Sequence, residues 1–276
     1  MEIKLSDHFG YRRLFRFTMP SIIMMVFCSI YGVVDGIFVS NFIKDDGASF
    51  TAVNLIMPLL MFFSAVGFMI GTGGSALVSK IMGQGDLKRA NGIFSMLVYV
   101  SIALGIFFTV LGLLILRDAS IWFGAEGKTL EACLAYGYIL IPSLTFFLLQ
   151  NVFQSFCVAA EKPNLGLGFT VGAGITNIVL DALLVPRLGI RGAAIATALS
   201  QCVGGIGPVI YFARENSSLL RLSWAKIEGK VLLRTCTNGS SELMSNLSLN
   251  LVSMLYNWQL MNYAGEEGVA AYNEDK

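Results

Sequence analysis

Three acidic residues lie within long apolar stretches of the sequence: Asp35, Asp181 and Glu242. A charged side chain costs several kcal/mol at the centre of a membrane, so an acid in such a place indicates a binding or proton-transfer site. Asn177 precedes Asp181 by one helical turn, and both side chains would face the same way from a helix. Thr197, in the next apolar stretch, could add a hydroxyl if the two helices pack together. Such oxygen ligands suit a hard cation such as Na⁺, and a carboxylate can also carry a proton.

Each of these acids also has a structural interpretation that the sequence leaves open. Asp35 could meet water at the membrane interface, and so could Glu242, because its stretch is the most polar one. Asp181 could cap a helix end near Pro186. Pro20, fifteen residues before Asp35, has no backbone N–H, so a helix through it can bend. We therefore predict that Pro20 is a hinge.

Other chemistry finds little support in the sequence. His8 is the single histidine and precedes the first apolar stretch in a basic segment, so no Ser/His/Asp or Cys/His set can be assembled and no enzyme is predicted. The cysteines are odd in number and lack CxxC spacing, which argues against a disulfide framework and a zinc site. They are Cys28, Cys133, Cys157, Cys202 and Cys236.

The elements that must position the acids are membrane-spanning helices. The chain has 276 residues, of which 55% are hydrophobic and 13% charged, with a mean hydropathy of +0.69. Soluble domains carry about 25% charged residues, so the bilayer is the expected solvent of this chain. A net charge of +1 without a basic, aromatic patch argues against a nucleic-acid partner. The sequence predicts an all-α, polytopic integral membrane protein surrounded by lipid.

Seven stretches are long enough to cross the hydrocarbon core, which takes about 20 apolar residues in a helix. Small residues recur at four-residue spacing in some of them, such as Gly67 and Gly71, and this pattern favours close helix packing. The Lys and Arg residues are concentrated in segments on the N-terminal side, which predicts a cytoplasmic N-terminus in the cytoplasmic (inner) membrane. The stretches are 17–42, 51–79, 92–116, 132–158, 165–185, 192–213 and 231–264.

The chain resembles the multidrug and toxic compound extrusion (MATE) transporters in several local strings. The most specific are TNIVLD at 176–181 and GIRGAAIAT at 189–197. Their order and spacing cover nearly the whole chain. Further matching strings lie at 17–20, 34–39, 52–58, 67–74, 79–86 and 160–163.

This resemblance implies an antiporter that exports organic, often cationic, drugs and is driven by inward Na⁺ or H⁺. No cofactor other than the coupling ion is implied. Members of that family form a cation site from an acid of the first span, an Asn and an Asp of the fifth and a Thr of the sixth. The matching residues here are Asp35, Asn177, Asp181 and Thr197, and some members add a Glu of the seventh span, which Glu242 resembles.

The resemblance also predicts the domain organisation. Family members have twelve spans in two six-helix lobes. Residues 1–213 would form a six-helix N-terminal lobe, 214–230 a cytoplasmic linker, and 231–276 the first helix of a truncated C-terminal lobe. A missing C-terminal lobe would then be a partner of this chain.

Two alternatives to a drug antiporter stay open at the level of the sequence. One is a non-transporting remnant or fragment of such a transporter. The other is a lipid-linked oligosaccharide flippase of the same superfamily, which would be expected to have a cationic cavity for pyrophosphate. The predicted spans instead hold acids and lack a buried Lys or Arg, which favours the antiporter.

Overall fold

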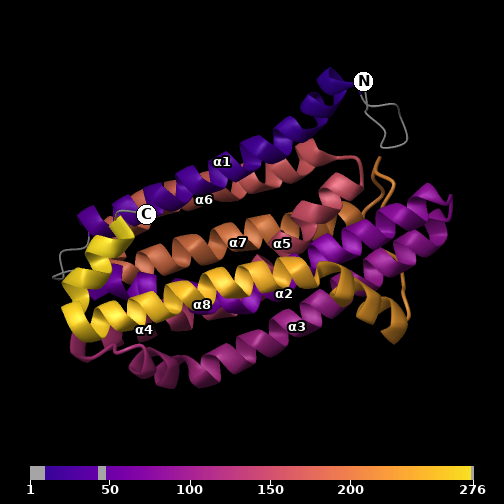
Figure 1. Ribbon diagram of the computed structural model, residues 1–276. Helices are drawn as coiled ribbons and strands as arrows, with labels where there is room; N and C mark the ends of the chain where they lie inside the picture. Colours follow the sequence, from indigo (N-terminus) through magenta and orange to yellow (C-terminus); the bar gives the residue numbers. More distant parts are fainter. Residues whose placement is uncertain (1–9, 43–47, 275–276) are drawn as a thin grey trace.

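The computed structural model describes residues 10–42 and 48–274, and within this part it is helical with no strand. The side chains of Asp35 and of residues 265–274 are outside the description. Figure 1 shows long helices lying side by side in an elongated bundle. The elements are α1 (Tyr11–Phe42), α2 (Ala48–Gly83), α3 (Leu87–Trp122), α4 (Gly127–Leu140), the short 3₁₀ helix η1 (Ile141–Ser143), α5 (Leu144–Ala159), α6 (Pro163–Leu188), α7 (Ile190–Ala213) and α8 (Gly229–Glu274).

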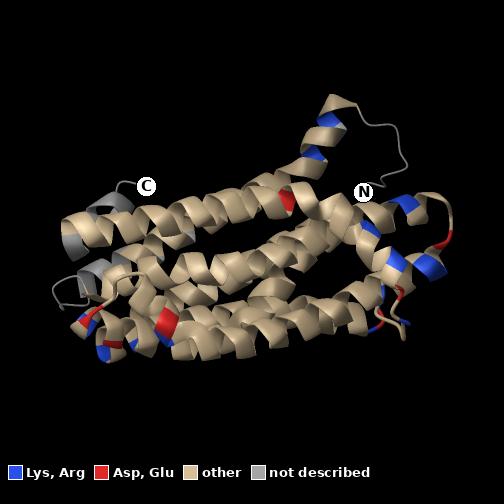
Figure 2. Ribbon diagram, turned by 60° about the horizontal axis from the view of Figure 1, so that its bottom comes forward, with Lys and Arg blue, Asp and Glu red and all other residues tan. Residues whose placement is uncertain are grey.

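Six segments of the described chain are long and apolar enough to cross a membrane. They confirm the first six predicted stretches and the fold class, an all-α membrane bundle. Figure 2 shows that the charged residues gather toward the two ends of the bundle and that its middle is largely free of them. The segments are Leu14–Val34, Ala48–Gly83, Leu87–Trp122, Gly127–Ala159, Pro163–Leu188 and Ile190–Ala213.

The fourth of these segments is interrupted, although the sequence predicts one continuous stretch at 132–158. Pro142 has no N–H to donate, and the chain passes through η1 between α4 and α5. Thr109 of α3 lies at this break, because its hydroxyl is 3.4 Å from the Ile141 carbonyl and 3.4 Å from the Thr145 hydroxyl. A hydroxyl of the neighbouring helix α3 thus contacts the chain where it passes from α4 to α5.

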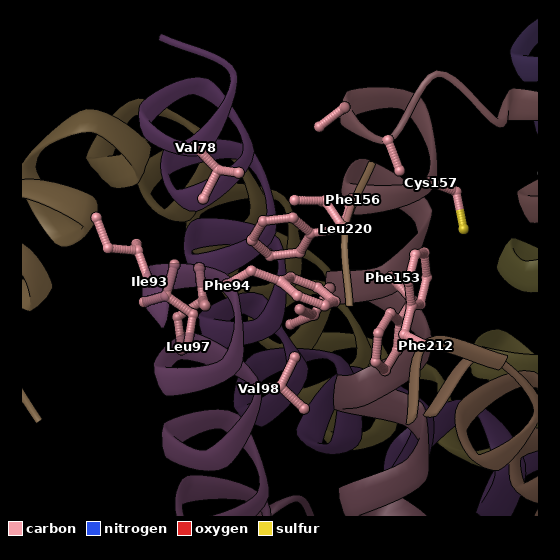
Figure 3. Packing of buried hydrophobic residues seen from close by; sticks show 14 of the residues in the cluster. Val78, Ile93, Phe94, Leu97, Val98, Phe153, Phe156, Cys157, Phe212 and Leu220 are labelled. Carbon is pink, nitrogen blue, oxygen red and sulfur yellow. The ribbon is translucent and has the colours of Figure 1, made fainter. Parts of the chain in front are cut away.

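The core on the side of the bundle where α3 begins is built from aromatic side chains. Phe153 of α5 stacks on Phe212 of α7 with ring centroids 5.7 Å apart, and Phe94 of α3 meets both rings edge-on (Figure 3). Leu220, which follows α7 in the chain, is fully buried in the same cluster. Aromatic contacts of this kind stabilise the packing beyond the burial of area alone.

Helix α8 packs antiparallel along α2. Gly73 of α2 lies directly against the Thr235 carbonyl, and the Asn257 amide donates to the Asn54 carbonyl at 2.8 Å. Glycine at this position permits the two backbones to approach closely. The predicted small-residue stripe of α2 faces a different helix, because Gly67 and Gly71 lie against the backbone of α5. α8 is not among the six apolar segments, so the membrane-spanning role of the seventh stretch stays a prediction.

The segment 214–228 connects α7 to α8 without regular helix and is held against the first turns of α3. The backbone N–H groups of Arg221 and Ser223 donate to the Asn91 and Ser95 side chains at 2.9 and 2.8 Å. The Tyr99 hydroxyl donates to the Ser223 carbonyl at 3.3 Å. A row of side chains on one face of α3 therefore fixes the position of this linker.

Candidate cation site

Asn177 and Asp181 lie on the buried stripe of α6. Their exposed fractions are 2% and 0%, and the other buried positions of α6 follow the same spacing of three or four residues. α6 packs against α7 and α1, so the stripe faces the interior of the bundle rather than lipid. The structure thus places the carboxylate and the amide where the helical spacing predicted them, on one face and away from water.

Thr197 comes to this stripe because α6 and α7 form a tight antiparallel pair. The chain reverses at Gly189, whose φ of 59° is a conformation that glycine adopts without strain. Gly192 lies against the Leu184 backbone just beyond the turn. One face of α7 then runs along α6, and the Asn177 amide donates to the Thr197 hydroxyl over 3.5 Å. Asn177 and Thr197 therefore meet at the α6–α7 contact, and Asp181 lies one turn from Asn177 on the same buried face of α6.

Asp35 and Pro20 are both in α1, which packs against α6. The Asp35 side chain lies outside the described residues, so its approach to Asp181 stays a prediction. Pro20 is buried, and the helix continues through it from Tyr11 to Phe42. Figure 1 shows α1 running beside α6 while its first turns rise away from the bundle.

Glu242 is in α8, in a different part of the bundle from the α6 pair. Its carboxylate accepts from the Asn246 amide at 3.1 Å, one turn further along the same helix. α8 packs chiefly against α2, whereas Asn177 and Asp181 belong to α6. The structure therefore does not join Glu242 to the other predicted site residues among the side chains that it describes.

Some buried polar residues were not singled out from the sequence. The Ser143 hydroxyl donates to the Gln201 side chain at 2.6 Å, and both residues are buried where α7 passes the break at η1. Asn246, which is half-buried, donates to the Glu242 carboxylate at 3.1 Å. The signal for these residues in the sequence is a neutral polar side chain within an apolar span or one turn from an acid.

The Asn177–Asp181–Thr197 group has the chemistry of a monovalent-cation or proton site. Asp181 supplies one negative charge, and the Asn177 carbonyl oxygen and the Thr197 hydroxyl are neutral oxygen ligands. The Asn177 carbonyl oxygen and the remaining lone pair of the Thr197 hydroxyl can coordinate a cation that has lost part of its hydration shell. Burial makes the isolated charged carboxylate unfavourable, so binding of a cation or a proton at this position is favourable.

Replacing Thr197 with valine tests the contact between α6 and α7. The change keeps the shape of the side chain but removes the acceptor of the Asn177 amide, and we expect a loss of about 1 kcal/mol in stability. Thermal unfolding in detergent measures this loss. Ser200→Ala is the matched control, because the Ser200 hydroxyl donates to the Thr197 carbonyl of its own helix at 2.8 Å. Equal stability of Thr197→Val and the wild type would contradict the contact.

The helices define an all-α, polytopic membrane protein. The MatE family model matches residues 20–183, more than half of the chain. The chain therefore belongs to the MatE family, whose members are transporters and not enzymes. The resemblance of the sequence strings to this family is confirmed.

The chain is similar to curated and solved transporters over nearly all of its length. Multidrug export protein MepA of Staphylococcus haemolyticus (strain JCSC1435) is 27% identical over 266 residues, which is 95% of this chain and 58% of that protein. An inward-facing multidrug resistance MATE family transporter of the MOP superfamily has a TM-score of 0.82 at 24% identity, covering 88% of this chain and 56% of the other. A MATE structure in the bent conformation gives 0.79 at 24% identity, over 94% and 58%. The chain thus spans just over half the length of these proteins, and the structural likeness shows the fold.

Proposed function

We propose that this chain forms the ion-coupling lobe of an antiporter that exports organic, often cationic, compounds in exchange for Na⁺ or H⁺. The observation that carries the proposal is the fully buried Asp181, which shares one helix face with Asn177 beside Thr197. A carboxylate in this position strongly favours binding of a cation. The cytoplasmic membrane, with the N-terminus in the cytoplasm, is its proposed place.

The exchange of ion for drug depends on whether the buried carboxylates are charged or neutralised by a bound cation. Binding of Na⁺ or H⁺ at Asp181 and Asp35 removes net charge from the interior of the lobe. A ligand shifts a conformational equilibrium only if it binds one state better than the other. We propose that the neutralised lobe favours bending of α1 around Pro20 and release of the exported compound on the outer side.

The charges of the bundle favour a cationic rather than an anionic substrate. Asp181 is the one charged side chain among the buried residues that the structure describes, and that buried set contains no Lys or Arg. A pyrophosphate-linked lipid would need cationic partners in its path. The name of the MepA relatives, multidrug export protein, supports the same class of small organic substrate.

Dye export from cells tests the proposal through Asp35. Cells that produce the chain should retain less of a fluorescent cationic dye than cells without it, and an Asp35→Asn variant should retain as much as cells without it. Asp118→Asn changes an exposed acid of α3 and is the matched control that should export normally. Unaltered export by Asp35→Asn would remove Asp35 from the mechanism. Absence of export by the wild-type chain would refute transport by this polypeptide alone.

A further inference from the structure

The linker between α7 and α8 presents apolar and basic side chains outward. Trp224 and Ile227 are 93% and 74% exposed. Arg221, Lys226 and Lys230 are exposed around them, and Glu228 is the only acid between Arg221 and Lys230. A nearly bare tryptophan among cationic residues is unusual for a surface that faces only water.

The exposed side chains are held in place. Asn91, Ser95 and Tyr99 of α3 bind the linker backbone on one side of Trp224, and the Glu228 N–H lies 3.1 Å from the Met96 sulfur on the other. Leu220 is anchored in the aromatic core and has no exposed surface. The outward position of Trp224 is thus a fixed feature of the fold.

The height of this segment matches the edge of the membrane. α3 has 36 residues, so its length is about 54 Å, against a hydrocarbon core of about 30 Å. A central placement puts the edge of the hydrocarbon about 12 Å from the start of α3, close to Ser95. Ser95 binds Ser223, the residue before Trp224. Trp224 therefore lies at the level where tryptophan is enriched in membrane proteins.

We infer that the segment 221–230 is a membrane anchor that binds the headgroups of anionic phospholipids in the leaflet on the N-terminal side of the bundle. Trp224 and Ile227 would enter the interface, and Arg221, Lys226 and Lys230 would pair with lipid phosphates. Each basic residue close to such a surface attracts anionic lipid, and the attraction weakens with salt. The inference does not depend on antiport, because it concerns the linker and not the ion site.

Quenching of Trp224 by brominated lipid tests this inference. The chain has three tryptophans, and the other two, Trp122 and Trp258, stack on each other with ring centroids 6.4 Å apart, so both are replaced by phenylalanine. This single-tryptophan protein is placed in vesicles of phosphatidylcholine and phosphatidylglycerol in equal parts, with bromine on one lipid at a time. We expect quenching by brominated phosphatidylglycerol to be at least about twofold stronger than quenching by brominated phosphatidylcholine.

Charge-neutral variants separate lipid binding from simple proximity. Arg221→Gln, Lys226→Gln and Lys230→Gln together should abolish the preference for the anionic lipid. The matched control removes three exposed arginines from the opposite end of the bundle, Arg117, Arg187 and Arg191, and should keep it. High salt should reduce the preference in the unneutralised single-tryptophan protein, which gives a second readout if the neutral variant does not fold.

Several results would overturn the anchor. Emission from Trp224 that neither brominated lipid quenches would place the linker in water. Equal quenching by the two lipids, or a preference that survives neutralisation and high salt, would exclude recognition of anionic headgroups. Shielding of Trp224 that grows with the number of chains per vesicle, without lipid quenching, would assign the surface to a second copy.

Discussion

An Asp181→Asn variant is expected to lose export of a cationic dye by at least about tenfold. The amide takes up no proton and brings no negative charge to hold Na⁺, so ion binding can no longer bias the conformational equilibrium. Asp181 is fully buried, and asparagine has nearly the same shape. The variant should therefore fold, and its loss should be one of function. Initial rates of dye export from cells with equal amounts of protein in the membrane measure the effect.

The control for this experiment is a change of the same kind at an exposed site. Asp118→Asn also converts a carboxylate to an amide, but Asp118 is exposed near the end of α3. It should leave export unchanged. Wild-type rates for Asp181→Asn would show that the buried acid does not couple ion movement to export, and a loss with both variants would point to a general effect of negative charge.

Replacement of Gly73 with alanine is expected to separate α8 from α2. A methyl group at this position would meet the Thr235 carbonyl and the Gly239 nitrogen, the latter at 2.7 Å, and these backbone atoms cannot rotate away. Overpacking of this kind costs about 1–3 kcal/mol. The melting temperature in detergent should fall by several degrees, and α8 should become more accessible to protease.

Gly172 of α6 provides the matched control, because a methyl group there meets nothing within 4 Å. Alanine inside a helix is more favourable than glycine by about 0.5–1 kcal/mol, so Gly172→Ala should be neutral or slightly stabilising. A melting temperature of Gly73→Ala that equals that of Gly172→Ala would mean that α8 does not lie against α2 at this point.

The sequence predicted the helices well because lipid imposes a simple rule on a spanning segment. Every backbone polar group must be satisfied within the segment, so long apolar runs become helices. The stretches 51–79 and 165–185 lie within α2 and α6 for this reason. The seventh stretch, predicted as a membrane span, is also one helix. It is the most polar of the seven and is not among the six apolar segments, so its crossing of the membrane stays a prediction.

The features that escaped prediction depend on contacts between distant segments. Pro142 alone does not predict η1, because prolines 58 and 208 lie inside continuous helices. The row of α3 side chains that binds the linker could not be recognised, since Asn91 and Ser95 are ordinary residues for the start of a helix. Their role arises only when the segment after α7 returns across α3.

The candidate site was predictable in part. Asn177 and Asp181 are on one helix, so their common face follows from the spacing, and the structure buries both. The approach of Thr197 requires the turn at Gly189, which is a matter of tertiary structure. Glu242 was grouped with these residues by family resemblance, and its described partner is instead Asn246 on its own helix.

Direct measurement of ion binding by the purified chain tests the central claim, that Asn177, Asp181 and Thr197 hold the coupling ion. Sodium binding and proton uptake or release are recorded together in weakly buffered detergent solution for the wild type, Asp181→Asn and Thr197→Val. We predict saturable binding to a single class of site in the wild type, weaker binding in Thr197→Val and loss of that class of site in Asp181→Asn. Binding of Na⁺ and protons by Asp181→Asn at the level of the wild type would contradict it.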